Sequence, residues 1–167
     1  MITDLREINR VLLIINELTI NCQAKFVDVI DECKNVVLGG KRVNHEETIN
    51  FCILSGIILK SDEFIRYSPL GKKILQANFE KVWELNTTQK ILLIENCFLD
   101  GFYAEKSIAI LKQFLPDNYK KTFVFSKQDS NFLYGNPSDI QLLIQVGLIL
   151  DDEKLMVVNP EFSKLLS

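Results

Sequence analysis

Apolar positions in the first twenty residues repeat at helical spacing and predict a helix over residues 3–19. Asp4 and Glu7 stand at the spacing of a capping box, in which two side chains satisfy the free backbone amides at a helix start. The positions that share one helical face behind this box are Leu5, Ile8, Leu12, Ile15 and Leu18.

Two further amphipathic stretches predict two more helices. The first covers residues 22–40 and is expected to end at Gly39 and Gly40, because glycine tolerates the left-handed conformation that closes a helix. Its apolar stripe consists of Phe26, Ile30, Cys33 and Val37. The second helix runs from Asn44 to Gly56, and its expected buried positions are Ile49, Cys52 and Ile53.

Two short apolar runs, at residues 57–61 and 64–68, flank Asp62 and Glu63 and predict a small hairpin. Ser68 is placed to cap a following helix whose first residue is Pro69, which has no amide hydrogen to lose. We expect this helix to continue to Leu85 and to lead into a second domain. The apolar positions that indicate the continuation are Leu75, Phe79 and Val82.

The hairpin and its flanking helices recur 91 positions later without a gap. The matched pairs are Ile49 with Ile140, Ile53 with Ile144, Gly56 with Gly147, Ile58 with Ile149, Leu59 with Leu150, Pro69 with Pro160, Lys73 with Lys164 and Leu75 with Leu166. The matches fall on apolar and turn positions, which a shared backbone requires, while the charges between them differ. The repeat predicts two modules of one architecture, residues 1–85 and 86–167.

Three helices followed by a two-stranded wing resemble the winged helix-turn-helix superfamily. The stretch ETINFCILSGIILKSDEFIRYSPLGKKIL, residues 47–75, looks like the third helix, wing and following helix of many bacterial winged-helix domains. The second copy departs from this pattern, because Glu161 replaces Leu70 and Phe162 replaces Gly71 in the turn that leaves the wing. The resemblance implies a mainly α fold with β-hairpin wings, arranged as two winged-helix modules in tandem.

Residues 87–99 and 103–115 read as the first two helices of the second module, and an insertion follows at 116–135. Within it Lys120, Lys121 and Lys127 are interleaved with aromatic residues, a mixture expected of a strand that tracks phosphates or stacks on bases. The simpler interpretation, which we favour, places Phe123 and Phe125 in the core and leaves the lysines in solvent.

Composition indicates a globular protein with few means of catalysis. The 167 residues are 47% hydrophobic and 25% charged, and neither a membrane-spanning run nor a signal peptide stands out, so we expect a cytoplasmic location. The four cysteines, Cys22, Cys33, Cys52 and Cys97, are expected to be buried thiols. No motif for a metal, a cofactor or an enzymatic reaction is evident, and the single histidine, His45, is expected to lie in the first turn of helix three.

In a winged helix the third helix ordinarily enters the major groove of DNA, so its outward residues indicate the ligand. Those predicted to face outward are Glu47, Asn50, Phe51 and Leu54 in module one and Ser138, Gln141, Leu142 and Gln145 in module two. Neither set contains a cation, the second wing tip reads Asp151, Asp152 and Glu153, and the net charge is −3.

We therefore favour a non-catalytic recognition or assembly module that contacts another protein or a second copy of itself through Phe51, Leu54 and Leu142. The resemblance implies a bacterial, DNA-associated complex, as in transcription, chromosome maintenance and phage defence or restriction. The alternative is a regulator that binds duplex DNA through Lys41, Arg42, Arg66, Lys72 and Lys73, with Asn50, Gln141 and Gln145 reading adenine. Because the helix opened by Pro160 stops at Ser167, we also expect the chain to be the N-terminal part of a longer protein.

Overall fold

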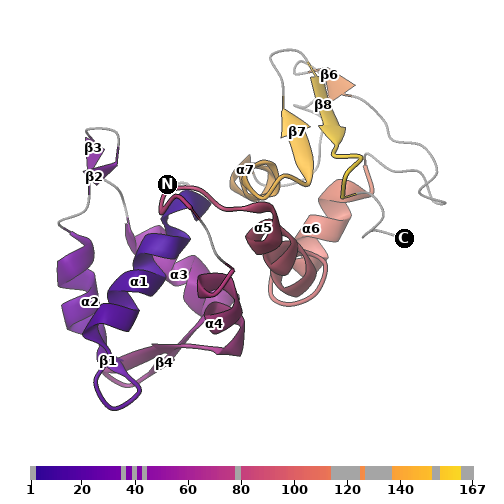
Figure 1. The fold of residues 1–167 in the computed structure, drawn as a ribbon. Coiled ribbons are helices and arrows are strands. Elements are labelled where there is room, and N and C mark those ends of the chain that lie inside the picture. The colour runs from indigo at the N-terminus through magenta and orange to yellow at the C-terminus, as the bar shows by residue number, and fades with distance from the viewer. Residues whose placement is uncertain are drawn as a thin grey trace. The chain divides into compact units, whose positions relative to one another are not determined.

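The computed structural model of the chain is mainly helical with small antiparallel sheets, and it forms two compact units, residues 1–92 and 93–167 (Figure 1). The structure describes residues 3–34, 37–38, 41–42, 45–77, 80–113, 125–126, 137–151 and 155–162. The predicted mainly α class with small hairpins is therefore confirmed. Most of the predicted insertion at 116–135 lies outside the described residues.

The first unit is built around helix α1, which packs against α2, α3 and α4 (Figure 1). Its apolar face buries Ile8, Val11, Leu12, Ile14 and Ile15, and each such side chain contributes up to about 1.5–3 kcal/mol by leaving water. In chain order the elements are η1 (Leu5–Glu7), α1 (Ile8–Leu18), β1 (Ala24–Lys25), α2 (Phe26–Cys33), β2 (Val37–Leu38), β3 (Lys41–Arg42), α3 (His45–Leu54), β4 (Ile58–Ser61), β5 (Phe64–Tyr67) and α4 (Pro69–Leu75).

The predicted hairpin forms as β4 and β5 and gains a third strand. Ser61 pairs with Phe64 across Asp62 and Glu63, and Asp62 takes the left-handed backbone conformation (φ 52°) that a tight turn needs. Strand β1 pairs antiparallel with β5, so the sheet order is β1-β5-β4. A strand from the α1–α2 connection therefore lies beside the hairpin that follows α3.

Helix α2 ends at Cys33, earlier than the apolar stripe predicted. Val37 belongs instead to strand β2, which pairs with β3 so that Val37 faces Arg42 and Leu38 faces Lys41. The extension of the helix to Val37 was wrong because the local sequence carries a competing signal. Successive valines favour extended backbone, and the dipeptide Gly-Gly at 39–40 is a strong hairpin signal.

Helix α4 ends at Leu75, so its predicted continuation through Val82 to Leu85 was wrong, while Phe79 lies outside the described residues. Side chains from the next segment bind carbonyl groups at and just after the helix end: Gln89 Nε2 donates to Ile74 O (2.9 Å) in the last turn, and Asn86 Nδ2 donates to Ala77 O (2.7 Å) two residues beyond Leu75.

The second unit continues α5 (Thr87–Leu93) into a π-helical turn, η2 (Ile94–Phe98). The remaining elements are α6 (Ala104–Leu111), β6 (Phe125–Ser126), α7 (Pro137–Gln145), β7 (Ile149–Asp151) and β8 (Leu155–Val158). Its sheet has the order β6-β8-β7. The third strand here follows α6 and belongs to the predicted insertion, whereas β1 of the first unit precedes α2.

The backbone repeats at the predicted offset of 91 residues. Gly56 and Gly147 both close a helix in the left-handed conformation, with φ of 78° and 87°. The Ser68 amide donates to Ile57 O at 2.9 Å, and the equivalent Asn159 amide donates to Leu148 O at 2.8 Å. The repeat seen in the sequence is therefore a repeat of structure.

The two copies differ at one position that controls packing. A Cβ atom at Gly71 would overlap the carbonyl oxygen of Ile57, so α4 lies against this residue, which directly precedes β4, only because Gly71 has no side chain. The second copy has Phe162 at that position, and its side chain is buried. The close approach that Gly71 permits in the first unit therefore has no counterpart at Phe162.

Candidate functional site

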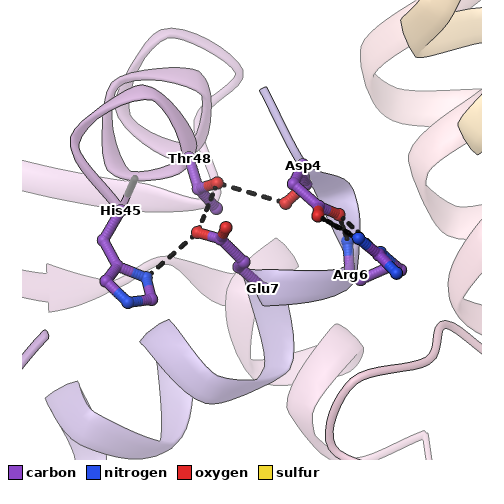
Figure 2. Close-up of polar contacts among 5 residues, drawn as sticks. All are labelled: Asp4, Arg6, Glu7, His45 and Thr48. Carbon is purple, nitrogen blue, oxygen red and sulfur yellow. Dashed lines mark hydrogen bonds and ion pairs between the residues drawn. The ribbon is translucent and has the colours of Figure 1, made fainter. Parts of the chain in front are cut away.

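The most strongly polar buried cluster joins η1 to the first turn of α3. Glu7 comes from η1, while His45 and Thr48, three residues apart on α3, face it from one side (Figure 2). Thr48 Oγ1 lies 3.0 Å from Glu7 Oε2 and 3.1 Å from Asp4 O, and His45 Nδ1 lies 3.0 Å from the same Glu7 oxygen. The imidazole contact has ion-pair distance without hydrogen-bond alignment.

This cluster is closed to solvent. The side chains of Glu7 and His45 are 1% and 5% exposed, and Glu7 Oε1 and His45 Nε2 make no hydrogen bond with any residue that the structure describes. A carboxylate beside an imidazole is a common acid–base pair, but a substrate must be able to reach it. The burial favours a structural role, in which the cluster fixes η1 against α3. His45 lies in the first turn of α3, as predicted. Its contact with Glu7 was not predicted.

At the surface beside the cluster, Asp4 caps η1 and forms an ion pair with Arg6 (2.6 Å), as Figure 2 shows. Partial burial raises the pKa of Asp4, but the hydrogen bonds and the positive charge of Arg6 outweigh it and hold the pKa below its usual value. The predicted capping box is therefore only half formed, because Glu7 turns inward to α3.

The structure also has an open hollow of about 760 Å³ in the first unit, where β5 passes into α4. We call it the β5–α4 hollow. Its floor comes from the outer face of the hairpin, and one wall comes from the turn between α1 and β1. The residues that line it are Thr19, Asn21, Cys22, Leu59, Arg66, Tyr67, Ser68, Pro69 and Lys72.

The local sequence explains how this hollow is built. Asn21 and Cys22 both adopt left-handed backbone conformations (φ 53° and 68°), which turn the chain sharply from α1 into β1. Tyr67 is held by a hydrogen bond from its hydroxyl to Asn16 Oδ1 (3.3 Å), and Ser68 caps α4 by accepting from the Gly71 amide (3.1 Å).

The hollow brings together two of the cations predicted to contact nucleic acid. Arg66 and Lys72 both line it and are exposed, and neither forms an ion pair among the described residues. Lys73 is exposed on α4 but does not line the hollow. Lys41 and Arg42 form β3, and their side chains are not described. Lys120, Lys121 and Lys127 lie outside the described residues.

Two of the three predicted protein-contact residues are core residues. Phe51 is 1% exposed and Leu142 is 5% exposed, so the prediction that they face outward was wrong, whereas Leu54 is 49% exposed. Asn50 is exposed on α3, and Gln141 and Gln145 are half-buried on α7. The outer stripe of α3 therefore consists of Glu46, Asn50 and Leu54, spaced four residues apart.

The cysteines are free thiols, but they are not all buried. Cys33, Cys52 and Cys97 lie in the two cores, while Cys22 is exposed at the edge of the β5–α4 hollow because it occupies a turn. Within the described ranges, no group of three or more His, Cys, Asp and Glu side chains is placed to hold a metal ion. Nor does any helix among those residues have the length and apolarity to cross a membrane.

Comparison with protein families, with curated proteins and with solved structures gave no match for this chain. Its function must therefore be argued from its own surfaces. Sequence reasoning missed the turn residues Thr19, Asn21 and Cys22 as lining residues. The one available signal was Asn21, since asparagine is common where a tight turn requires positive φ.

Proposed function

We propose that this chain is a non-catalytic tandem winged-helix module that acts mainly by binding another protein within a DNA-associated complex. Apart from the short β2–β3 pair between α2 and α3, the first unit has the order helix, strand, helix, helix and hairpin, with β1 paired to β5, and this order supports the winged-helix assignment. The repeated helix end and hairpin of the second unit support the tandem arrangement.

The observation that carries the choice of ligand is the outer stripe of α3. In a winged helix this face would meet the bases, yet it presents Glu46 and the half-exposed Leu54, with Asn50 between them. A glutamate repels the phosphate backbone, and an exposed leucine gains most when another protein covers it. The hairpin tip adds two exposed acidic residues, Asp62 and Glu63.

A matched pair of photo-crosslinking variants tests this proposal in cells that express the chain. Benzoylphenylalanine at Leu54 is expected to form a protein adduct, while the same group at Glu80, which is exposed outside α3, is expected to form none. Light scattering of the purified chain then decides whether the adduct is a second copy or another protein. An adduct with DNA at Leu54 would contradict the proposal.

The second candidate is duplex DNA binding through the first unit, and one observation favours it: Arg66 and Lys72 share a single hollow. Binding of a labelled random duplex at several salt concentrations separates the two candidates. Protein recognition predicts weak binding with a shallow salt slope. A steep slope, on the order of six released counterions, would favour the DNA candidate instead. Reversing the charges of Lys41, Arg42, Lys72 and Lys73 would then abolish the binding.

A further inference from the structure

The β5–α4 hollow carries positive charge that the described part of the protein does not balance. Arg66 and Lys72 line it from β5 and α4, and no Asp or Glu is among its lining residues. Neither cation makes an ion pair within the described ranges, although four other Lys and Arg side chains do so there. Uncompensated cations around one hollow favour an anionic occupant.

The same hollow has an apolar border. Leu59 pairs across the hairpin with Arg66, so both side chains stand on the outer face of the sheet, and Leu59 is 41% exposed. Ile20, between the lining residues Thr19 and Asn21, is 75% exposed. Charge and exposed apolar surface therefore lie side by side.

We propose that the β5–α4 hollow binds an acidic peptide segment of a partner protein, with a bulky apolar residue of that segment against Leu59 and Ile20. This rests on the proposed function, since it names the chemistry of the partner. The planar guanidinium of Arg66 suits a carboxylate, which it can bind through two parallel hydrogen bonds. Lys72 supplies a second charge from the last turn of α4.

The surroundings favour a peptide over a nucleic acid. A duplex presents phosphates continuously, so a protein that binds it needs a broad cationic surface. Here the tip of the same hairpin carries Asp62 and Glu63, and both are exposed. A peptide can place one or two carboxylates in the hollow and avoid the tip.

The test is an NMR titration of the ¹⁵N-labelled full chain with a defined probe. The probe is an eight-residue peptide, blocked at both ends, that alternates Glu or Asp with Leu; a matched peptide carries Gln and Asn in place of the acids. We expect the acidic peptide to shift the amide signals of residues 19–22 and 59–72.

The double variant Arg66→Gln/Lys72→Gln should weaken binding about threefold to tenfold, as expected for two exposed charge contacts. The control Lys106→Gln/Lys112→Gln, which removes two exposed lysines of the second unit, should leave it unchanged.

Three results would overturn the inference. They are equal binding of the neutral peptide, no localised shifts at up to about 1 mM peptide, and displacement of the peptide by a duplex that itself depends on Arg66 and Lys72. Only the last also contradicts protein recognition. If the chain does not bind the acidic peptide and binds duplex DNA only weakly, with a shallow salt slope, the peptide site is ruled out and the proposed function still stands.

Discussion

Asn9 and Gln89, eighty positions apart in the chain, exchange hydrogen bonds in the buried interior of the first unit. Gln89 Nε2 donates to Asn9 Oδ1 at 2.6 Å, and Asn9 Nδ2 lies 3.3 Å from Gln89 Oε1. Gln89 Oε1 also accepts from the backbone amide of Asn86, and Asn86 Oδ1 accepts from the backbone amide of Gln89. These two bonds form a capping box at the start of α5. The Gln89 side chain therefore caps the start of α5 and donates to Ile74 O in the last turn of α4. Through Asn9 it also links both helices to α1. This explains why the unit extends to residue 92, past the boundary expected at 85.

Replacing Gln89 by Leu should destabilise the first unit strongly. The change removes the donor to Asn9 Oδ1 and the acceptor of the Asn86 backbone amide, and each unsatisfied buried group costs about 1–3 kcal/mol. Asn9 Nδ2 keeps its bond to Glu84 O, and Ile74 O keeps its bond from the Ala77 amide. Urea unfolding followed by the fluorescence of Trp83, the only tryptophan, measures the loss. The exposed amide of Asn50 offers the control, since Asn50→Ala should change stability by less than about 0.5 kcal/mol. Equal effects of the two changes would show that the buried amides contribute nothing.

The same substitution should change the stability of the fold by very different amounts at two nearby apolar residues of α3. Phe51→Ser removes a fully buried ring and should cost about 3–5 kcal/mol, whereas Leu54→Ser should be nearly neutral for folding because this side chain is half-exposed. Thermal unfolding by circular dichroism distinguishes them. A stable Phe51→Ser variant would place the ring at the surface and contradict the structure.

Gly71 should not tolerate even a methyl group. In an open helix, Gly→Ala raises stability by roughly 1 kcal/mol, but here the new Cβ would meet Ile57 O and force α4 away from β4. We expect a net loss of about 1–3 kcal/mol, as for other overpacked sites. Lys73→Ala, at an exposed position of the same helix, provides the reference. A stabilised Gly71→Ala variant would show that the helix has room to move.

The thiols should differ in reactivity and in their effect on pH stability. A thiol reagent at pH 8 should modify Cys22 of the native chain quickly and the three buried cysteines only after unfolding. Burial raises the pKa of Cys33 to about 11, with a smaller opposing effect from Arg10. Since the folded-state pKa lies above the ordinary value of about 8.5, the thiol stabilises the fold fully below pH 8.5 and less as the pH rises toward 11.

Urea midpoints measured from pH 7.5 to 10.5 test the pH effect, with Cys33→Ala as the comparison. Other groups titrate in this range in both proteins, so the informative quantity is the difference between the two slopes. The parent chain should lose stability more steeply with rising pH than the variant. Parallel slopes would mean that the Cys33 thiol has the same pKa in the folded and unfolded states, as an exposed thiol would.

Local signals in the sequence determined much of the fold. The turn at Asp62 and Glu63, the Ser68 cap before Pro69 and the glycines at 56 and 147 each act within a few residues, so the β4–β5 hairpin, the start of α4 and the 91-residue repeat were predictable. Arg66 and Lys72 were also recognised as candidate ligand-binding residues from their charge alone. The sequence did not predict that these two side chains line the same hollow, because this depends on how the α1–β1 turn folds against the sheet.

The tertiary structure decided which faces are buried and where helices end. Residues 51–54 of α3 are four consecutive apolar side chains, so periodicity alone gives no buried face; packing of α3 against α1, α2 and β4 buries Phe51 and leaves Leu54 exposed. Helix α4 ends at Leu75 because Asn86 and Gln89 take carbonyl groups at its end. Glu7 turns from its expected cap toward Thr48 and His45, forty residues away, because a buried carboxylate needs polar partners that only the folded chain supplies.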